Sequence, residues 1–157
     1  KVSAEVIEGE GILLDAYRES KLLDRYLETA AIKNDLSLGE ARILLYLAHP
    51  HDKCSRKELA DITNMTRAGL SMTLQKLTGK GLIQIRDNGN KREAEEKNTV
   101  RQLDIVLLKA ADPIVEDLLI AQKDYRQMMF SGFGEEEMEQ YLFMNEKIRA
   151  NIQKALK

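Results

Sequence analysis

The sequence is poor in cysteine, proline and tryptophan: it has one cysteine, two prolines and no tryptophan among 157 residues. A single cysteine cannot form a disulfide within the chain, which excludes a disulfide-stabilised scaffold. Scarce proline together with 32% charged residues favours helices over a turn-rich β architecture. We therefore expect a mainly α-helical protein.

Long hydrophobic runs are missing as well. No run approaches the roughly 18 to 20 apolar residues that a membrane span needs, and the first residues show no basic-then-apolar signal pattern. We therefore expect a cytoplasmic protein with no membrane-spanning segment. Hydrophobic residues still make up 43% of the chain, which is enough for a packed core.

The charge is distributed unevenly along the chain. The net charge of −2 and the pI near 5.8 argue, for the whole chain, against nucleic-acid binding. From Lys53 to Arg101, however, eleven Lys and Arg stand against six Asp and Glu, a net charge of +5, and the remainder carries −7. A basic middle between acidic ends keeps a nucleic-acid partner open.

The first half of the chain shows helical periodicity punctuated by helix-start signals. Apolar residues recur at near-helical spacing from Glu10 to Asn34, which predicts a long amphipathic helix. "SLGE" at residues 37–40 is a capping-box pattern, in which a Ser hydroxyl and a Glu carboxylate bind the free N–H groups of a helix start. The helix that it opens ends before Pro50.

Two short helices with a tight turn follow. "SRKE" at residues 55–58 opens a helix that runs to Thr63, and Asn64 suits the turn because Asn tolerates a left-handed backbone. Thr66 caps the next helix, which runs to about Gly79 and buries one face. The residues of that face are Leu70, Leu74 and Leu77. Together these segments form a helix-turn-helix outline.

The pattern then changes to strands and back to helices. Residues 82–86 alternate as a strand does, and residues 100–106 can return beside them across a polar loop that contains Asn88-Gly89. Asp112-Pro113 suits the start of a helix, "SGFG" at residues 131–134 interrupts it, and a last helix with an acidic start follows. The expected order is helix, helix, helix-turn-helix, wing, helix, helix.

Three segments, "LSLGEARILLYLA", "SRKELADITNMTRAGLSMTLQKLTGKGLI" and "FSGFGEEEMEQYLFMNEKI", resemble the MarR/SlyA family of winged-helix transcription regulators. The resemblance implies a homodimer that binds near-palindromic double-stranded DNA, with no cofactor and no enzymatic activity. It implies a DNA-binding lobe at residues 37–108 and a dimerisation region at residues 1–36 and 109–157. Independently of the resemblance, the amphipathic end segments must bury their apolar faces, and a second subunit is a simple way to do so. A twofold dimer would then place two recognition helices about 34 Å apart along the duplex.

The second helix of the helix-turn-helix would read the DNA. Arg67 suits guanine edges or phosphate, Gln75 suits adenine, and Ala68 or Met72 suits a thymine methyl. Two features depart from the family pattern: Met72 stands where relatives often carry Arg, and Gly69 lies inside a helix at a cost of about 1 kcal/mol relative to Ala. The full set of expected helix contacts is Ser55, Arg56, Thr66, Arg67, Ala68, Gly69, Ser71, Met72, Gln75 and Lys76, with Ser55, Arg56 and Thr66 on phosphates.

The wing is a second candidate for DNA contact, and its sequence matches the family pattern less well than that of the helix. In relatives an Arg of the wing enters the minor groove, and the resemblance points to Arg92, beside Lys91, for that role. Glu93, Glu95 and Glu96 follow directly and would repel phosphate unless the loop turns them away. A charged loop with little DNA contact is the alternative.

The remaining candidates concern regulation. Many relatives release DNA when a small molecule binds, and Tyr17, Arg42 and Tyr46 are candidates to line such an effector pocket, with core or surface packing as the alternative. "HPHDKC" at residues 49–54 gathers His49, His51 and Cys54, which leaves open a metal- or thiol-responsive sensor. Its spacing matches no established zinc motif, so a simple connector is favoured, with no metal. A protein-interaction module without DNA binding and a hydrolase using Cys54 also stay open.

Overall fold

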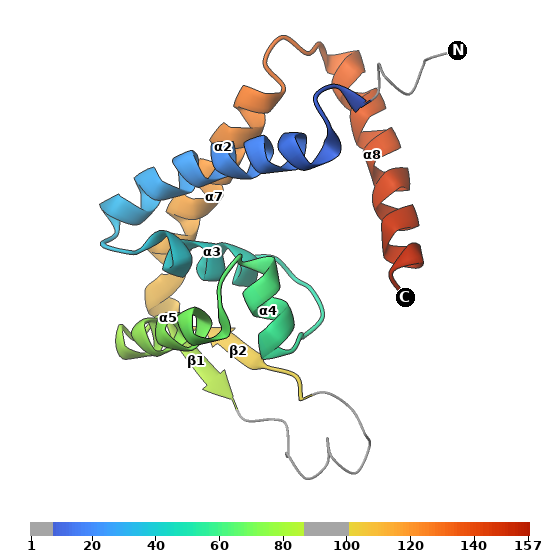
Figure 1. The fold of residues 1–157 in the computed structure, drawn as a ribbon. Helices are drawn as coiled ribbons and strands as arrows, with labels where there is room; N and C mark the ends of the chain where they lie inside the picture. The colour runs from blue at the N-terminus through green and yellow to red at the C-terminus, as the bar shows by residue number, and fades with distance from the viewer. Residues whose placement is uncertain (1–7, 87–100) are drawn as a thin grey trace. The chain divides into compact units, whose positions relative to one another are not determined.

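The computed structural model describes residues 8–86 and 101–157, and the chain divides into two compact units, Lys1–Lys123 and Asp124–Lys157. The described residues form helices and one small antiparallel sheet (Figure 1), which confirms the expected fold class of a mainly α protein with a β-wing. The division into a DNA-binding lobe and a dimerisation region stays a prediction.

The first unit follows the predicted order of elements closely. The helices are α2 (Ile12–Lys33), α3 (Leu38–Leu47), α4 (Arg56–Ile62), α5 (Arg67–Gly79) and the greater part of α7 (Asp112–Met129), which a 3-10 turn at Lys109–Ala111 precedes. The strands β1 (Ile83–Arg86) and β2 (Asp104–Leu107) lie between α5 and that turn. In Figure 1, α3, α4 and α5 gather beside the two strands.

Local side-chain chemistry sets the helix starts. The Ser37 hydroxyl accepts a hydrogen bond from the Glu40 N–H at 3.1 Å, and the Glu40 carboxylate accepts one from the Ser37 N–H at 3.1 Å, so the predicted capping box is confirmed. Ser55 and Thr66 cap α4 and α5 in the same manner through their side-chain oxygens. These bonds satisfy donors that a helix start leaves without intrahelical partners.

Left-handed residues end the two helices of the helix-turn-helix. Asn64 follows α4 with φ of 57°, as its residue type predicted. Gly81 follows α5 with φ of 72°, a conformation that glycine adopts without steric cost. The Leu82 N–H then donates to the Leu77 carbonyl at 3.1 Å, which turns the chain directly from α5 into β1.

The sheet pairs β1 and β2 antiparallel, with Ile83 opposite Leu107 and Arg86 opposite Asp104. The second strand begins at Asp104, further along the chain than the predicted start at residue 100, which lies outside the described residues. Cys54 forms an isolated bridge with Leu103, whose N–H donates to the Cys54 carbonyl at 2.8 Å. The connector between α3 and α4 therefore pairs with the base of the wing.

One hydrophobic core unites the helices of the first unit. The Leu70, Leu74 and Leu77 face of α5 is buried, as its spacing predicted. Contributions also come from α2, α3, α4, β1 and α7. The largest fully buried side chains are Leu27, Ile43, Leu44, Leu59, Leu70, Leu74, Leu77, Ile83 and Leu118.

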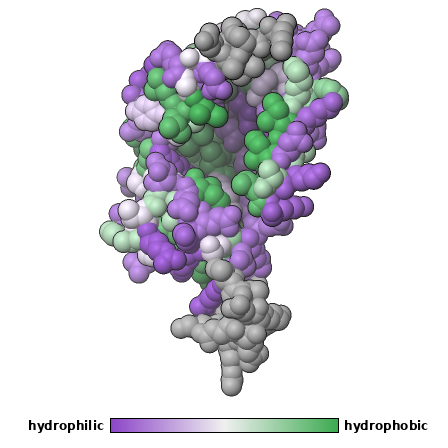
Figure 2. Space-filling view, turned by 45° about the vertical axis from the view of Figure 1, so that its right-hand side comes forward, coloured by the Kyte–Doolittle hydropathy of each residue, from purple (hydrophilic) through white to green (hydrophobic). Residues whose placement is uncertain are grey.

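The second unit contains the end of α7 and helix α8 (Glu135–Ala155). Phe130 contacts Phe133 and Tyr141, with ring centroids 5.4 Å and 4.6 Å apart, and the Glu137 carboxylate accepts a hydrogen bond from the Gly134 N–H at 2.9 Å. No residue of α8, from 135 to 155, is buried. Hydrophobic side chains also lie open at the surface in Figure 2. Large exposed hydrophobic residues of α8 are Leu142, Phe143, Met144, Ile148 and Ile152.

Candidate nucleic-acid interface

The core holds helix α5 by one face and leaves the opposite face in solvent. With its leucines buried, α5 exposes each of the other side chains predicted to contact DNA. The exposed residues are Arg67, Ala68, Ser71, Met72, Gln75 and Lys76. An exposed helix face with arginine in its first turn is what insertion into a major groove requires.

The cap of α5 explains why a glycine stands at position 69 inside the helix. The Thr66 Oγ1 accepts the Gly69 N–H at 3.0 Å, and a Cβ added at Gly69 would lie 3.1 Å from that same oxygen. Such an approach is closer than an ordinary contact, so a side chain would crowd the helix cap. The glycine that departs from good helix propensity therefore favours the capped start of α5.

A basic cleft of about 620 Å³ lies beside the start of α5. Arg67 meets the start of α4 there, together with the ends of the two strands at the base of the wing. Five cationic side chains line it, around a floor that includes Ile85 and Leu103. These cations are Arg56, Lys57, Arg67, Arg86 and Arg101. The cleft is suited to a phosphate backbone, because several cations converge on one open surface.

Three of these cations, Lys57, Arg86 and Arg101, were missed by the sequence analysis. Arg86 ends β1, opposite Asp104 in the antiparallel register, which brings the residues just before β2 to the same end of the sheet. The net positive charge of residues 53–101 indicated a basic surface but not which cations form it. The pairing of the two strands is what brings these cations to the cleft. Within the cleft, the Asp104 carboxylate lies 3.5 Å from the Lys53 Nζ.

Of the remaining residues predicted to contact DNA, one lies at the basic cleft and two belong to the wing. Ser55 lines the basic cleft, and its hydroxyl accepts the Glu58 N–H at 3.1 Å. Lys91 and Arg92 lie outside the described residues, so the predicted wing contacts stay predictions.

Two of the three predicted effector residues line one cavity. Arg42 and Tyr46 line an open cavity of about 320 Å³, to which α2, α3 and the turn after α4 also contribute. The Arg42 guanidinium pairs there with the Asp24 carboxylate, through Nε at 3.1 Å and through Nη2. Tyr17 is not among the lining residues: its side chain is exposed, with the Lys21 Nζ 5.9 Å from its ring.

The "HPHDKC" segment separates its three candidate ligands. The His49 Nε2 lies 3.1 Å from the Gln122 Oε1, and the His51 ring stacks on Tyr46 with centroids 3.9 Å apart. Cys54 is buried, with its Sγ 3.4 Å from the Tyr46 hydroxyl. Burial, together with this contact, raises the pKa of Tyr46 above its ordinary value of 10.0. Among the described residues, no group of three His, Cys, Asp or Glu comes together as a metal site.

Comparisons with known proteins identify a family model that matches part of the chain. Residues 34–93 match the model of the MarR family. No curated protein shows a significant match. None of the helices formed by residues 8–86 and 101–157 has the length and apolar character to cross a membrane.

Solved structures share the fold along nearly the whole chain. A MarR-family regulator from Silicibacter pomeroyi matches with a TM-score of 0.66 and 20% identity, covering 96% of this chain and 97% of its own. A MarR regulator from Methanosarcina mazei matches with a TM-score of 0.67 and 14% identity, covering 98% and 94%. A MarR-family regulator from Listeria monocytogenes, complexed with a 26mer DNA, matches with a TM-score of 0.63 and 19% identity, covering 90% and 88%.

Proposed function

We propose that the protein is a non-catalytic, sequence-specific DNA-binding transcription regulator of the MarR family, because residues 34–93 match the model of that family and solved MarR regulators share the fold. One observation carries the proposal. The exposed first turn of α5, with Arg67, borders a cleft that four further cations line. A base-reading element beside a phosphate-binding surface is the combination that specific DNA recognition needs.

The two parts of this surface have different tasks. Cations of the cleft neutralise phosphates, which gives affinity but carries no sequence information. Arg67, Gln75 and Met72 on the exposed face of α5 meet base edges, where hydrogen-bonding patterns and thymine methyl groups distinguish the base pairs. Ser55, Arg56 and Thr66 lie at or next to helix starts, where N–H groups favour a phosphate.

The regulator acts as a homodimer on a near-palindromic operator. Exposed large hydrophobic residues gather on α8 and at the start of α2, and such surfaces on a protein mark an interaction site. A second copy of the chain is the simplest partner, because twofold symmetry covers the same surface on both subunits. The symmetric pair then offers two α5 helices to successive major grooves on one face of the duplex.

A small-molecule effector controls DNA release, so the regulator is a ligand-responsive repressor. The cavity beside Arg42 and Tyr46 supports this part of the proposal, since it combines apolar walls with a guanidinium and a phenol. It borders both α2 and the residues after α4, so a ligand there contacts the long helix and the helix-turn-helix together.

Selection of bound fragments from genomic DNA tests the proposal, followed by affinity measurements on the selected duplex over a series of salt concentrations. We expect a specific fragment to be enriched, with an affinity that falls steeply as salt rises. Failure to enrich any fragment over random DNA at moderate salt would refute the function.

Two substitutions on α5 separate base reading from phosphate binding. Arg67→Ala should weaken binding to the selected duplex by about 1 to 3 kcal/mol and relax the preference at one base position, whereas Lys76→Ala should mainly flatten the salt dependence. An equal loss on specific and random DNA for Arg67→Ala would remove Arg67 from the base-reading set.

A further inference from the structure

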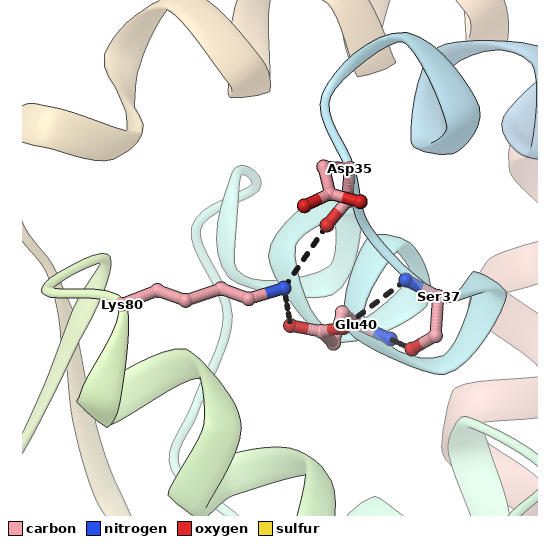
Figure 3. A network of polar contacts seen from close by, with 4 residues as sticks. All are labelled: Asp35, Ser37, Glu40 and Lys80. Atoms are coloured by element: carbon pink, nitrogen blue, oxygen red, sulfur yellow. Dashed lines mark hydrogen bonds and ion pairs between the residues drawn. The ribbon is translucent and has the colours of Figure 1, made fainter.

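A single ammonium group joins three elements at the far end of α5 from Arg67. Lys80 follows α5 directly, and its Nζ donates to the Asp35 carbonyl at 3.1 Å and to the Glu40 Oε2 at 2.8 Å (Figure 3). Asp35 lies in the turn after α2, and Glu40 lies in the first turn of α3. The end of the recognition helix is therefore bonded to the corner between α2 and α3.

The carboxylate of this contact is buried and fully engaged. The Glu40 side chain is only 4% exposed, its Oε1 accepts the Ser37 N–H, and its Oε2 accepts the Lys80 ammonium. Burial alone would raise the pKa of Glu40, but the bonds from Lys80 and Ser37 outweigh burial and hold that pKa below its ordinary value. A buried carboxylate that loses its cation is strongly unfavourable, so this ion pair is unlike a loose surface contact.

A small change at the Lys80–Glu40 contact produces a large displacement of the base-reading end of α5. Helix α5 has 13 residues, which corresponds to roughly 20 Å from Lys80 to Arg67. A tilt of about 5° at the Lys80 end moves the first turn by nearly 2 Å, whereas recognition groups must hold their place within about 0.5 Å. The leucine face of α5 resists withdrawal from the core, but hydrophobic contacts are non-directional and tolerate small tilts.

We propose that Lys80 and Glu40 are positioning residues that set the angle of α5 against the α2–α3 corner and thereby support the sequence-specific part of DNA binding. This inference rests on the proposed function. Lys80 acts through Glu40 and the Asp35 carbonyl. The two residues govern the ratio of specific to non-specific affinity, while the cations of the basic cleft govern the affinity common to all DNA.

Glu40→Gln tests the proposal, because it removes the partner charge while leaving the Lys80 ammonium in place. Its affinities for the selected duplex and for a random duplex are measured at one salt concentration. We expect the specific-to-random ratio to fall at least 10-fold. The matched control is Glu58→Gln, which removes a carboxylate from the equivalent third position of α4, and its ratio should stay within 2-fold of wild type.

Lys80 variants decide between positioning and direct phosphate contact. Lys80→Met should lower the same ratio, and Lys80→Arg should restore most of it, because a guanidinium can bind both acceptors. If Lys80 bound phosphate directly, Lys80→Met would weaken binding to both duplexes alike and Glu40→Gln would strengthen it by freeing the ammonium. That pair of results would overturn the proposal.

Amide hydrogen exchange supplies a readout that does not depend on DNA. In Lys80→Met the N–H groups of Leu36 and Ser37 should exchange at least 10-fold faster, while the amides of α8 keep wild-type rates. Unchanged exchange at the α2–α3 corner would overturn the link between Lys80 and this corner. If wild type enriches no DNA fragment, the proposed function fails, and the exchange data still decide on the link. If Lys80→Met does not fold, Lys80→Gln serves the same comparison, because it also removes the ammonium group.

Discussion

The exposed hydrophobic face of α8 gives the sharpest test of the proposed dimer. Ile148 and Ile152 lie one helical turn apart, and each leaves more than half of its surface in solvent, 56% and 54%. We expect Ile148→Glu to convert the dimer into monomers, because the substitution removes buried apolar surface and brings a carboxylate into the subunit contact.

The size of the effect follows from the exposed fraction. Complete burial of an isoleucine side chain contributes about 1.5 to 3 kcal/mol, so covering the exposed half of Ile148 contributes roughly 1 to 1.5 kcal/mol. A twofold interface contains the substitution twice, and the carboxylates add a desolvation cost to this loss. The dimer should therefore lose about 3 kcal/mol or more, which is roughly a 100-fold or greater rise in dissociation constant.

Sedimentation equilibrium over a range of protein concentrations measures this constant. The control is Ala150→Glu, which adds the same charge to α8 at roughly 200° around the helix from Ile148, and it should leave the dissociation constant near that of wild type. Equal weakening by both variants would show a general effect of charge on α8. A wild-type protein that stays monomeric at tens of micromolar would refute the dimer.

Three further predictions concern the proposed DNA-binding lobe. Thr66→Ala should lower the free energy of unfolding in urea by about 1 kcal/mol, because it deletes the side-chain cap of α5; an unchanged midpoint would contradict that role. Arg86→Ala should make the negative slope of log affinity against log salt shallower by about 0.9 with base preference retained, whereas Lys154→Ala on α8 should not change the slope. The pKa of Glu40 is lowered in the folded state, so its contribution to stability is present above 4.5 and is lost as pH falls further. The stability difference between wild type and Lys80→Met should therefore shrink on acidification, as urea titrations at several pH values would detect.

Local chemistry made much of the fold predictable. The starts of α3, α4 and α5 depend on Ser37, Ser55 and Thr66, each of which binds an N–H three residues ahead, and such short-range contacts leave a direct sequence pattern. The buried face of α5 followed from the spacing of its leucines, and the end of α4 from the left-handed tolerance of Asn64.

Contacts between residues far apart in the chain could not be predicted from the sequence. The Cys54–Leu103 bridge pairs a connector with the base of the wing, although its six-residue segment carried no strand pattern. The Lys80 ammonium reaches acceptors 45 and 40 residues earlier, which no periodicity indicates. Tyr17 was proposed for the effector pocket from its residue type, but its place on the exposed start of α2 depends on packing that composition does not specify.

The acidic net charge of the whole chain is compatible with DNA binding because charge acts locally in salt. At physiological ionic strength interactions between exposed charges fade over about 8 Å, so a phosphate at the basic cleft interacts with its five lining cations far more than with acidic groups beyond that range. The acidic start of α8, residues 135–137, stabilises its own helix through the dipole. The net charge of the whole chain is therefore a poor guide to whether it binds DNA. The charge of each segment is the better guide, together with the hairpin register that brings Arg86 to the cleft.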